Sequence, residues 1–166
     1  MYIRTTWLSP LGEITLVCDG EALNRLCLPG QEIPEGSVRD GDHPILEQTK
    51  DWLSRYFRGE APDPGALPLR PEGTDFRKLI WKLLLRIPYC ETISYGDLAK
   101  EAARILGKPR MSAQAVGQAL RYNPIPILIP CHRVLGADGS LTGYAGALEG
   151  GISIKRALLE LENRGK

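Results

Sequence analysis

The residues best suited to chemistry are a cysteine, a histidine and an arginine in a row, Cys131-His132-Arg133. They follow Asn123 and a segment of three prolines and several aliphatic residues, a composition that restricts the backbone and fixes the position of the thiol. A thiol beside an imidazole and a guanidinium can ionise at neutral pH, because nearby positive charge or a neutral imidazole base increases the thiolate fraction. The segment therefore predicts either a nucleophilic cysteine or a buried structural cysteine beside a hydrogen-bonded histidine.

The other three cysteines, Cys18, Cys27 and Cys90, are widely separated. No pair has the C-x-x-C spacing, and His43 and His132 are the only histidines, so the sequence predicts no metal site and no disulfide framework. Separate thiols are typical of a reducing compartment. No run approaches the ~20 apolar residues that span a bilayer, and no basic segment followed by an apolar stretch opens the chain. We expect a soluble, cytoplasmic protein with no membrane partner.

Charge is distributed unequally along the 166 residues. Residues 1–75 hold 7 Lys and Arg against 13 Asp and Glu, whereas residues 76–166 hold 14 against 7. The resulting net charges of −6 and +7 nearly cancel to the overall +1. The basic half indicates a polyanionic partner for the C-terminal part, although two solvated surfaces can also differ in charge by chance.

The N-terminal part predicts a small antiparallel β-meander. Strands are expected over 2–8, 13–18 and 22–28, because these segments are rich in β-branched, aromatic and other apolar residues. The sequences Ser9-Pro10-Leu11-Gly12 and Asp19-Gly20 between them have turn chemistry.

One helix is expected to pack on this meander. Residues 29–44 are rich in Pro and Gly and are interpreted as a loop, and apolar residues then recur at helical spacing from Ile45 until Gly59. Seven Pro and Gly residues within 59–73 argue against a regular element there. We therefore place a domain boundary after residue 73.

Residues 74–166 predict a helical lobe that contains a helix-turn-helix. A first helix begins near Thr74 and ends before Pro88. Ser94 and Asp97 then resemble a capping box that opens a helix over 95–106, and Ser112 is expected to cap the next helix, which reaches Tyr122. The fold class is thus α+β, with an N-terminal lobe over 1–73 and a helical C-terminal lobe over 74–166.

The helix after Ser112 has two unlike faces. One is expected to be buried and carries Ala113, Val116, Ala119 and Leu120; the opposite face carries Gln114, Gly117, Gln118 and Arg121. This outward face has no carboxylate, so it could approach a phosphate backbone and the floor of a groove. Helix-turn-helix geometry also occurs as plain structural packing, so both interpretations stay open at this point.

Together these segments resemble the O6-alkylguanine-DNA alkyltransferases, also called methylated-DNA protein-cysteine methyltransferases. The resemblance covers residues 74–162 closely and rests on Ala115-Val116-Gly117-Gln118-Ala119, Asn123-Pro124, Ile129-Pro130-Cys131-His132-Arg133-Val134, Gly143-Tyr144-Ala145-Gly146 and Leu158-Leu159-Glu160-Leu161-Glu162. It implies a single transfer of an alkyl group from O6-alkylguanine in double-stranded DNA to the Cys131 thiolate, after rotation of the damaged nucleotide out of the duplex. We expect a monomer that needs no cofactor.

The resemblance also implies roles for individual residues. His132 would take the Cys131 proton through a water, and Glu162 would orient and polarise His132. Asn123 would tie the recognition helix to the active-site turn, and Tyr95 would donate a proton or a hydrogen bond as the guanine leaves. The alkyl pocket would be lined by Pro126, Gly143, Tyr144 and Gly146. The recognition helix would enter the minor groove, with Arg121 as a phosphate or groove contact, and the DNA-binding residues would be Ser112, Gln114, Ala115, Gly117, Gln118 and Arg121.

Three features depart from the family pattern. Gln114 stands where the family usually has an arginine that fills the gap left by the flipped base, and about four residues are added between Gly146 and Lys155. Cys90 stands where glycine is commoner, and it could be an oxidisable bystander. Arg133 is expected to be structural and to pair with a carboxylate such as Asp75 or one nearby.

Two other functions stay open on the sequence alone. A non-catalytic alkyltransferase-like protein would recognise alkylated guanine without transferring the alkyl group, but such proteins typically carry tryptophan at the position of Cys131. A cysteine hydrolase would need an oxyanion hole, and no sequence feature supports a step in which water attacks an acyl group.

Overall fold

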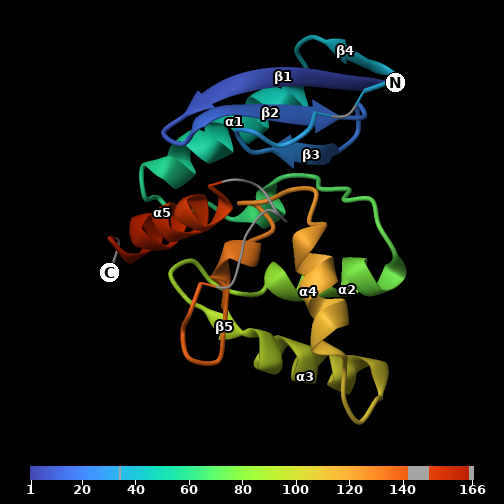
Figure 1. Cartoon of the computed structure of the whole chain (residues 1–166). Helices are drawn as coiled ribbons and strands as arrows, with labels where there is room; N and C mark the ends of the chain where they lie inside the picture. The colour runs from blue at the N-terminus through green and yellow to red at the C-terminus, as the bar shows by residue number, and fades with distance from the viewer. Residues whose placement is uncertain (34, 142–149, 165–166) are drawn as a thin grey trace. The chain divides into compact units, whose positions relative to one another are not determined.

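The structure is a computed structural model that describes residues 1–33, 35–141 and 150–164. Its internal contacts divide the chain into two units, Met1–Glu72 and Gly73–Lys166. That residues 1–73 and 74–166 fold as separate domains stays a proposal. The described parts combine a small sheet in the first unit with mainly helical structure in the second, which confirms the α+β class (Figure 1).

The first unit is built on a four-stranded sheet with the order β3-β2-β1-β4 (Figure 1). β1 (Tyr2–Ser9), β2 (Gly12–Cys18) and β3 (Leu23–Cys27) form the expected antiparallel meander. Gly12 has φ +120° at the turn between β1 and β2, a value that favours glycine. The meander buries an apolar face that includes Ile14, Leu16, Leu23 and Leu26.

The segment expected to be a loop over 29–44 contains a strand that the sequence pattern did not indicate. β4 (Val38–Asp40) pairs parallel to β1, with Tyr2 opposite Val38 and Arg4 opposite Asp40. Arg4 Nε also donates to Asp40 Oδ1 at 2.7 Å. Three residues at the edge of a sheet are too few for an alternation of apolar and polar side chains, so the prediction was wrong here.

α1 (Pro44–Phe57) packs against the sheet, as expected. It begins after His43, whose Nδ1 atom accepts the main-chain N–H of Ile45 at 3.1 Å. The Trp52 and Tyr56 rings stack with centroids 5.5 Å apart. The core of this unit thus lies between α1 and the sheet, and a short helical turn, η1 (Pro64–Ala66), follows.

The second unit contains the expected helix-turn-helix, formed by α3 (Tyr95–Leu106) and α4 (Ala113–Arg121) (Figure 1). The local signals act as predicted: the Oγ atom of Ser94 accepts the Asp97 N–H at 3.0 Å, and Gly107 ends α3 with φ +66°.

α2 (Asp75–Leu84) packs against both of these helices. The indole N–H of Trp81 donates to the main-chain oxygen of Ala119 at 2.8 Å, which fixes α2 to α4. The remaining elements of this unit are β5 (Ile93–Ser94), η2 (Cys131–Arg133), β6 (Val134–Leu135) and α5 (Gly151–Asn163), with β5 and β6 paired in parallel. None of the described helices is long and apolar enough to cross a membrane.

Candidate active site around Cys131

The turn after α4 is almost entirely buried, and Asn123 organises it. The Oδ1 atom of Asn123 accepts the N–H of Ile125 at 3.0 Å, and its Nδ2 atom donates to the main-chain oxygen of Ile129 at 2.8 Å. Ile127 has φ +74°, a conformation that costs a β-branched residue energy and therefore needs such support. The turn ends at Cys131, which opens η2.

The Cys131 thiol is buried, with 5% of the residue exposed. The Nδ2 atom of Asn123 lies 3.1 Å from Cys131 Sγ and donates to it. A donor at this distance stabilises a thiolate more than a thiol. The structure thus brings together two residues that the sequence assigned to catalysis.

His132 and Glu162 form a buried pair behind the thiol. His132 Nε2 lies 2.5 Å from Glu162 Oε2, and the two residues are 0% and 1% exposed. Burial lowers the pKa of His132, because the charged imidazolium loses its hydration, although the Glu162 carboxylate opposes this effect. The ring is therefore expected to be neutral and to donate Nε2–H to Glu162, so that Nδ1 is the basic nitrogen.

Arg133 shares the same carboxylate, which corrects the expected partner. The Nε atom of Arg133 donates to Glu162 Oε1 at 2.8 Å, and its Nη1 atom donates to the main-chain oxygen of Ile87 at 2.7 Å. Asp75 is exposed and is not the partner. Periodicity could not separate Glu160 from Glu162, but only the latter is buried. Arg133 is thus a structural residue, as expected, whose position helps to hold Glu162.

Cys90 contacts Glu162 twice and is therefore not a bystander. Its main-chain N–H donates to Glu162 Oε1 at 3.1 Å, and its Sγ atom donates to the main-chain oxygen of Glu162 at 2.9 Å. Cys90 has φ +71°, in the left-handed region that favours glycine. Cys90 thus holds both the carboxylate and the main chain of Glu162, the residue that pairs with His132.

The sequence interpretation missed Lys155, a fully buried cation. Its Nζ atom donates to the main-chain oxygen of Val134 at 2.7 Å and lies 5.9 Å from the centroid of the Tyr95 ring. Burial lowers the pKa of Lys155, and the nearby Cys131 opposes that shift because a thiolate favours the ammonium. The missed signal was its spacing, since Gly151, Lys155, Leu158 and Glu162 lie on one buried face of α5.

Two further groups of predicted site residues have different outcomes. Tyr95 is the first residue of α3 and is half-buried, and the centroid of its ring lies 5.9 Å from Lys155 Nζ. Pro126 is buried within the turn and forms an isolated β-bridge with Ile129. The pocket residues Gly143, Tyr144 and Gly146 lie outside the described residues.

The predicted DNA-contacting residues share the solvent-facing side of α4 and its cap. Ser112, Gln114, Gln118 and Arg121 are exposed, and Ala115 and Gly117 are half-buried. The Ser112 hydroxyl accepts the Ala115 N–H at 3.2 Å, so it caps the helix. Ala113 was expected on the buried face but is exposed, because it lies in the first turn, before α4 enters the core.

Gly117 gives independent information about this surface. A Cβ atom added at Gly117 would meet no described atom within 4 Å. Glycine inside a helix costs about 1 kcal/mol relative to alanine, and packing within the described part of the chain does not require it. The small residue therefore favours the close approach of another molecule.

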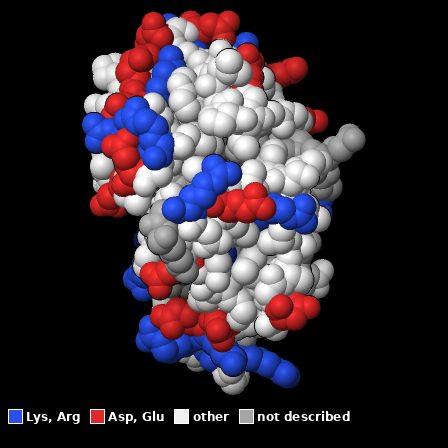
Figure 2. Space-filling view, turned by 90° about the vertical axis from the view of Figure 1, so that its left-hand side faces the viewer, with Lys and Arg blue, Asp and Glu red and all other residues white. Residues whose placement is uncertain are grey.

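Basic side chains gather at the end of this unit where α3 and the turn to α4 lie (Figure 2). The exposed cations of this region include Lys100, Lys108 and Arg110, which line a groove together with Met111. These exposed cations, together with the excess of Lys and Arg over Asp and Glu in residues 76–166, agree with a polyanionic partner for the second unit.

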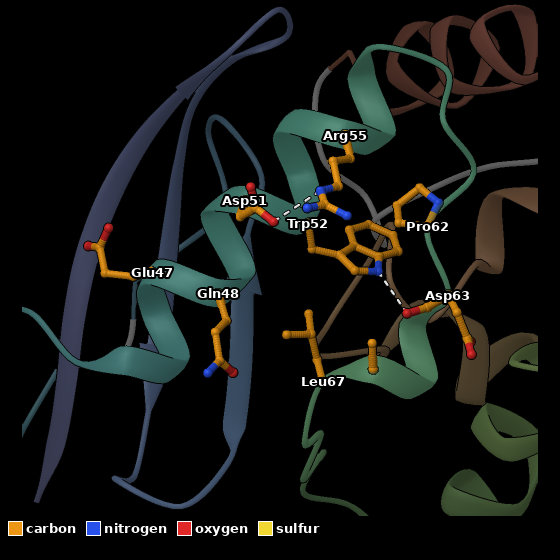
Figure 3. Close-up of a pocket in the computed structure, with 9 residues that line it drawn as sticks. Glu47, Gln48, Asp51, Trp52, Arg55, Pro62, Asp63 and Leu67 are labelled. Atoms are coloured by element: carbon orange, nitrogen blue, oxygen red, sulfur yellow. Dashed lines mark hydrogen bonds and ion pairs between the residues drawn. The ribbon is translucent and has the colours of Figure 1, made fainter.

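The first unit also contains a pocket, shown in Figure 3, at which Trp52 of α1 donates its indole N–H to the main-chain oxygen of Asp63 at 3.0 Å. Its charged groups already have partners: Asp51 pairs with Arg55, and the Asp63 carboxylate accepts the Gly65 N–H. The pocket therefore offers no arrangement comparable to that around Cys131.

Two family models match the chain. The model described as "6-O-methylguanine DNA methyltransferase, ribonuclease-like domain" matches residues 2–71, and the one described as "6-O-methylguanine DNA methyltransferase, DNA binding domain" matches residues 75–164. Together they account for both units of the structure.

Individual relatives agree with these models. The methylated-DNA–protein-cysteine methyltransferase of Mycobacterium bovis is 46% identical over 156 residues, which are 93% of this chain and 88% of the relative. The constitutive enzyme of the same name from Bacillus subtilis is 39% identical and covers 98% of this chain and 96% of its own. A crystal structure of Mycobacterium tuberculosis OGT in complex with DNA superposes with a TM-score of 0.83 at 41% identity, covering 98% of this chain and 94% of that one.

Proposed function

This chain belongs to the 6-O-methylguanine DNA methyltransferase family, and we propose on that premise that Cys131 is the residue that accepts the alkyl group. The protein repairs DNA by transferring an alkyl group from a damaged base to one of its own cysteines. The assignment rests on one observation: His132, which directly follows Cys131, forms a buried pair with Glu162. A base held by a carboxylate is the arrangement that activates a thiol.

The reaction begins with the loss of the Cys131 proton. His132, neutral because of its burial, accepts this proton through a water, while Glu162 holds the ring by its Nε2–H. The Nδ2 donor of Asn123 and the Lys155 ammonium stabilise the thiolate that forms.

The thiolate then displaces guanine from the alkyl carbon. The sulfur lone pair forms the new S–C bond, the bond between that carbon and O6 breaks, and its electrons pass to the guanine. Tyr95 donates its hydroxyl proton to the leaving base, which departs as neutral guanine, and the proton that His132 took from Cys131 restores the Tyr95 hydroxyl through solvent. The thioether has no good leaving group, so each molecule of protein reacts once.

DNA is the proposed partner through α4, and the lesion is O6-alkylguanine in a duplex. Gln114, Gly117, Gln118 and Arg121 face outward without a carboxylate among them, and Gly117 leaves room that the described chain does not use. Because the O6 atom cannot be reached inside a stacked duplex, the damaged nucleotide must rotate into the site, and Gln114 would contact the base that loses its partner.

Intact-protein mass spectrometry tests this function directly. After mixing with duplex DNA that contains O6-methylguanine, the protein should gain one methyl group on Cys131 and stop at one equivalent. The Cys131→Ser variant should gain none, and Cys27→Ser, which changes a buried cysteine of the sheet, should gain one. Binding of the lesion without added mass would overturn the transfer assignment and favour the non-catalytic role, which the named relatives do not favour.

We also propose that the protein acts as a monomer in the cytoplasm. Contacts within one chain bring Cys131 together with Asn123, and His132 together with Glu162, and the widely spaced cysteines form no disulfide among the described residues, which is typical of a reducing compartment. Analytical ultracentrifugation of the free protein should give the mass of one chain.

A further inference from the structure

A cluster of two arginines and a tyrosine joins α2 to the end of α4. The Arg77 guanidinium lies over the Tyr122 ring, 4.5 Å from its centroid, and the Arg121 guanidinium lies 5.8 Å from the same centroid. Tyr122 caps the C-terminal end of α4 and is 52% exposed, a large exposed fraction for an aromatic residue. The ring therefore serves an exposed surface rather than the core.

The two guanidiniums keep their charge available. Among the described residues, neither Arg77 nor Arg121 has a carboxylate at ion-pair distance, whereas Arg58, Arg70 and Arg104 all have one. The Tyr122 ring holds both cations by its π face, so they are positioned without being neutralised. Such a cluster fits a polyanion that can accept hydrogen bonds from planar guanidiniums and a phenol.

We propose that Arg77, Arg121 and Tyr122 bind the phosphate backbone of the DNA and extend the DNA interface from α4 onto α2. The proposal rests on the proposed function, because Arg121 continues the outward face of α4 at i+7 from Gln114. Tyr122 immediately precedes Asn123, whose side chain contacts Cys131. A phosphate bound by this cluster would therefore hold the DNA at the residue that directly precedes the active-site turn.

Salt dependence of DNA binding provides the test, since each phosphate contact adds about one to the slope of log affinity against log salt. Duplexes with and without O6-methylguanine are titrated between 50 and 200 mM NaCl. Arg77→Gln should lower the slope by about one for both duplexes, so that the loss of affinity over this range is about fourfold smaller than in the wild type. Arg86→Gln, which removes an exposed charge beyond the other end of α2, should leave the slope unchanged.

Tyrosine variants separate the ring from its hydroxyl. Tyr122→Phe keeps the aromatic face and should keep most of the slope, whereas Tyr122→Ala should lose as much as Arg77→Gln. The proposal is overturned if Arg77→Gln lowers only the unfolding temperature and leaves the slope unchanged, or if Arg86→Gln has the same effect. Failure of the underlying function would appear separately, as the absence of methyl transfer to the wild-type protein.

Discussion

The Nδ2 atom of Asn123 lies 3.1 Å from Cys131 Sγ while it also donates to the main-chain oxygen of Ile129. One amide thus connects the segment that follows α4, the proposed DNA-binding helix, to the proposed nucleophile, and it does so in a buried turn. Because the bond to sulfur is stronger when the sulfur is ionised, this contact favours the reactive form.

Asn123→Asp tests that contact. The acceptor for the Ile125 N–H is kept, but a carboxylate replaces the donor beside the sulfur and disfavours the thiolate. The rate of Cys131 alkylation by iodoacetamide, measured against pH and located by peptide mapping, should have its acid-side midpoint about one pH unit higher. Gln48→Glu adds the same charge at an exposed position of the first unit and should not move the profile.

Lys155→Met tests the buried cation. Removing the ammonium should slow methyl transfer about tenfold, because a buried charge that interacts with the thiolate is worth about 1.4 kcal/mol or more at an intermediate dielectric. Stability should change by less than about 1.5 kcal/mol, since Met fills a similar volume and its burial has no desolvation cost. Single-turnover kinetics and urea unfolding measure the two effects, and Arg156→Gln, on the exposed side of α5, is the control. An unchanged transfer rate would remove Lys155 from the mechanism.

Stability should fall in weakly acidic solution because of His132. Its pKa is lowered by burial from an ordinary value of 6.5, so the unfolded chain binds the proton more readily than the folded one. The free energy of unfolding should therefore be constant above about pH 7 and decrease below pH 6.5, by up to about 1.4 kcal/mol per pH unit. Urea unfolding at pH 7.5, 6.5 and 5.5 measures this slope. His132→Gln should reduce it.

Much of the helix-turn-helix could be predicted because its signals are local. Ser94, Gly107 and Ser112 each act on the backbone within a few residues, so the bounds of α3 and α4 follow from them. β4 could not be predicted in this way, since its three residues are held by pairing with β1, more than thirty residues earlier in the chain.

The candidate site divides in the same manner. Cys131, His132 and Asn123 lie within ten residues and have a recognisable pattern. The contacts of Glu162 with Arg133 and Cys90 join segments that are 29 and 72 residues apart, and nothing in the local sequence specifies them. Lys155 was overlooked because a lysine on a helix normally reaches solvent, and its burial depends on the tertiary packing of α5.

Cys90 should respond differently to two substitutions. Cys90→Gly relieves the positive φ and keeps the main-chain N–H that binds Glu162, but it loses the Sγ hydrogen bond to the main-chain oxygen of Glu162, so the free energy of unfolding should change by less than about 1 kcal/mol. Cys90→Val places a β-branched residue at the same φ, and should lower stability by about 1–3 kcal/mol and slow methyl transfer as Glu162 shifts. Equal effects of the two variants on urea unfolding would show that the backbone conformation at residue 90 is not what matters.

Gln114→Arg should accelerate repair, because residue 114 stands where the family usually has an arginine that occupies the gap left by the flipped base. Gln114 is exposed in the first turn of α4, so a longer side chain can be accommodated. Stopped-flow measurements with a fluorescent base opposite the lesion should show faster flipping and tighter lesion binding.

Gln118→Arg distinguishes insertion of the arginine from a general effect of charge. It adds the same charge one turn further along the outward face of α4, so it should tighten binding to damaged and undamaged duplexes alike and leave the flipping rate unchanged. If Gln114→Arg behaves like Gln118→Arg, the charge alone accounts for its effect. If Gln114→Arg changes neither lesion affinity nor repair rate, glutamine already stabilises the extruded state as well as arginine would.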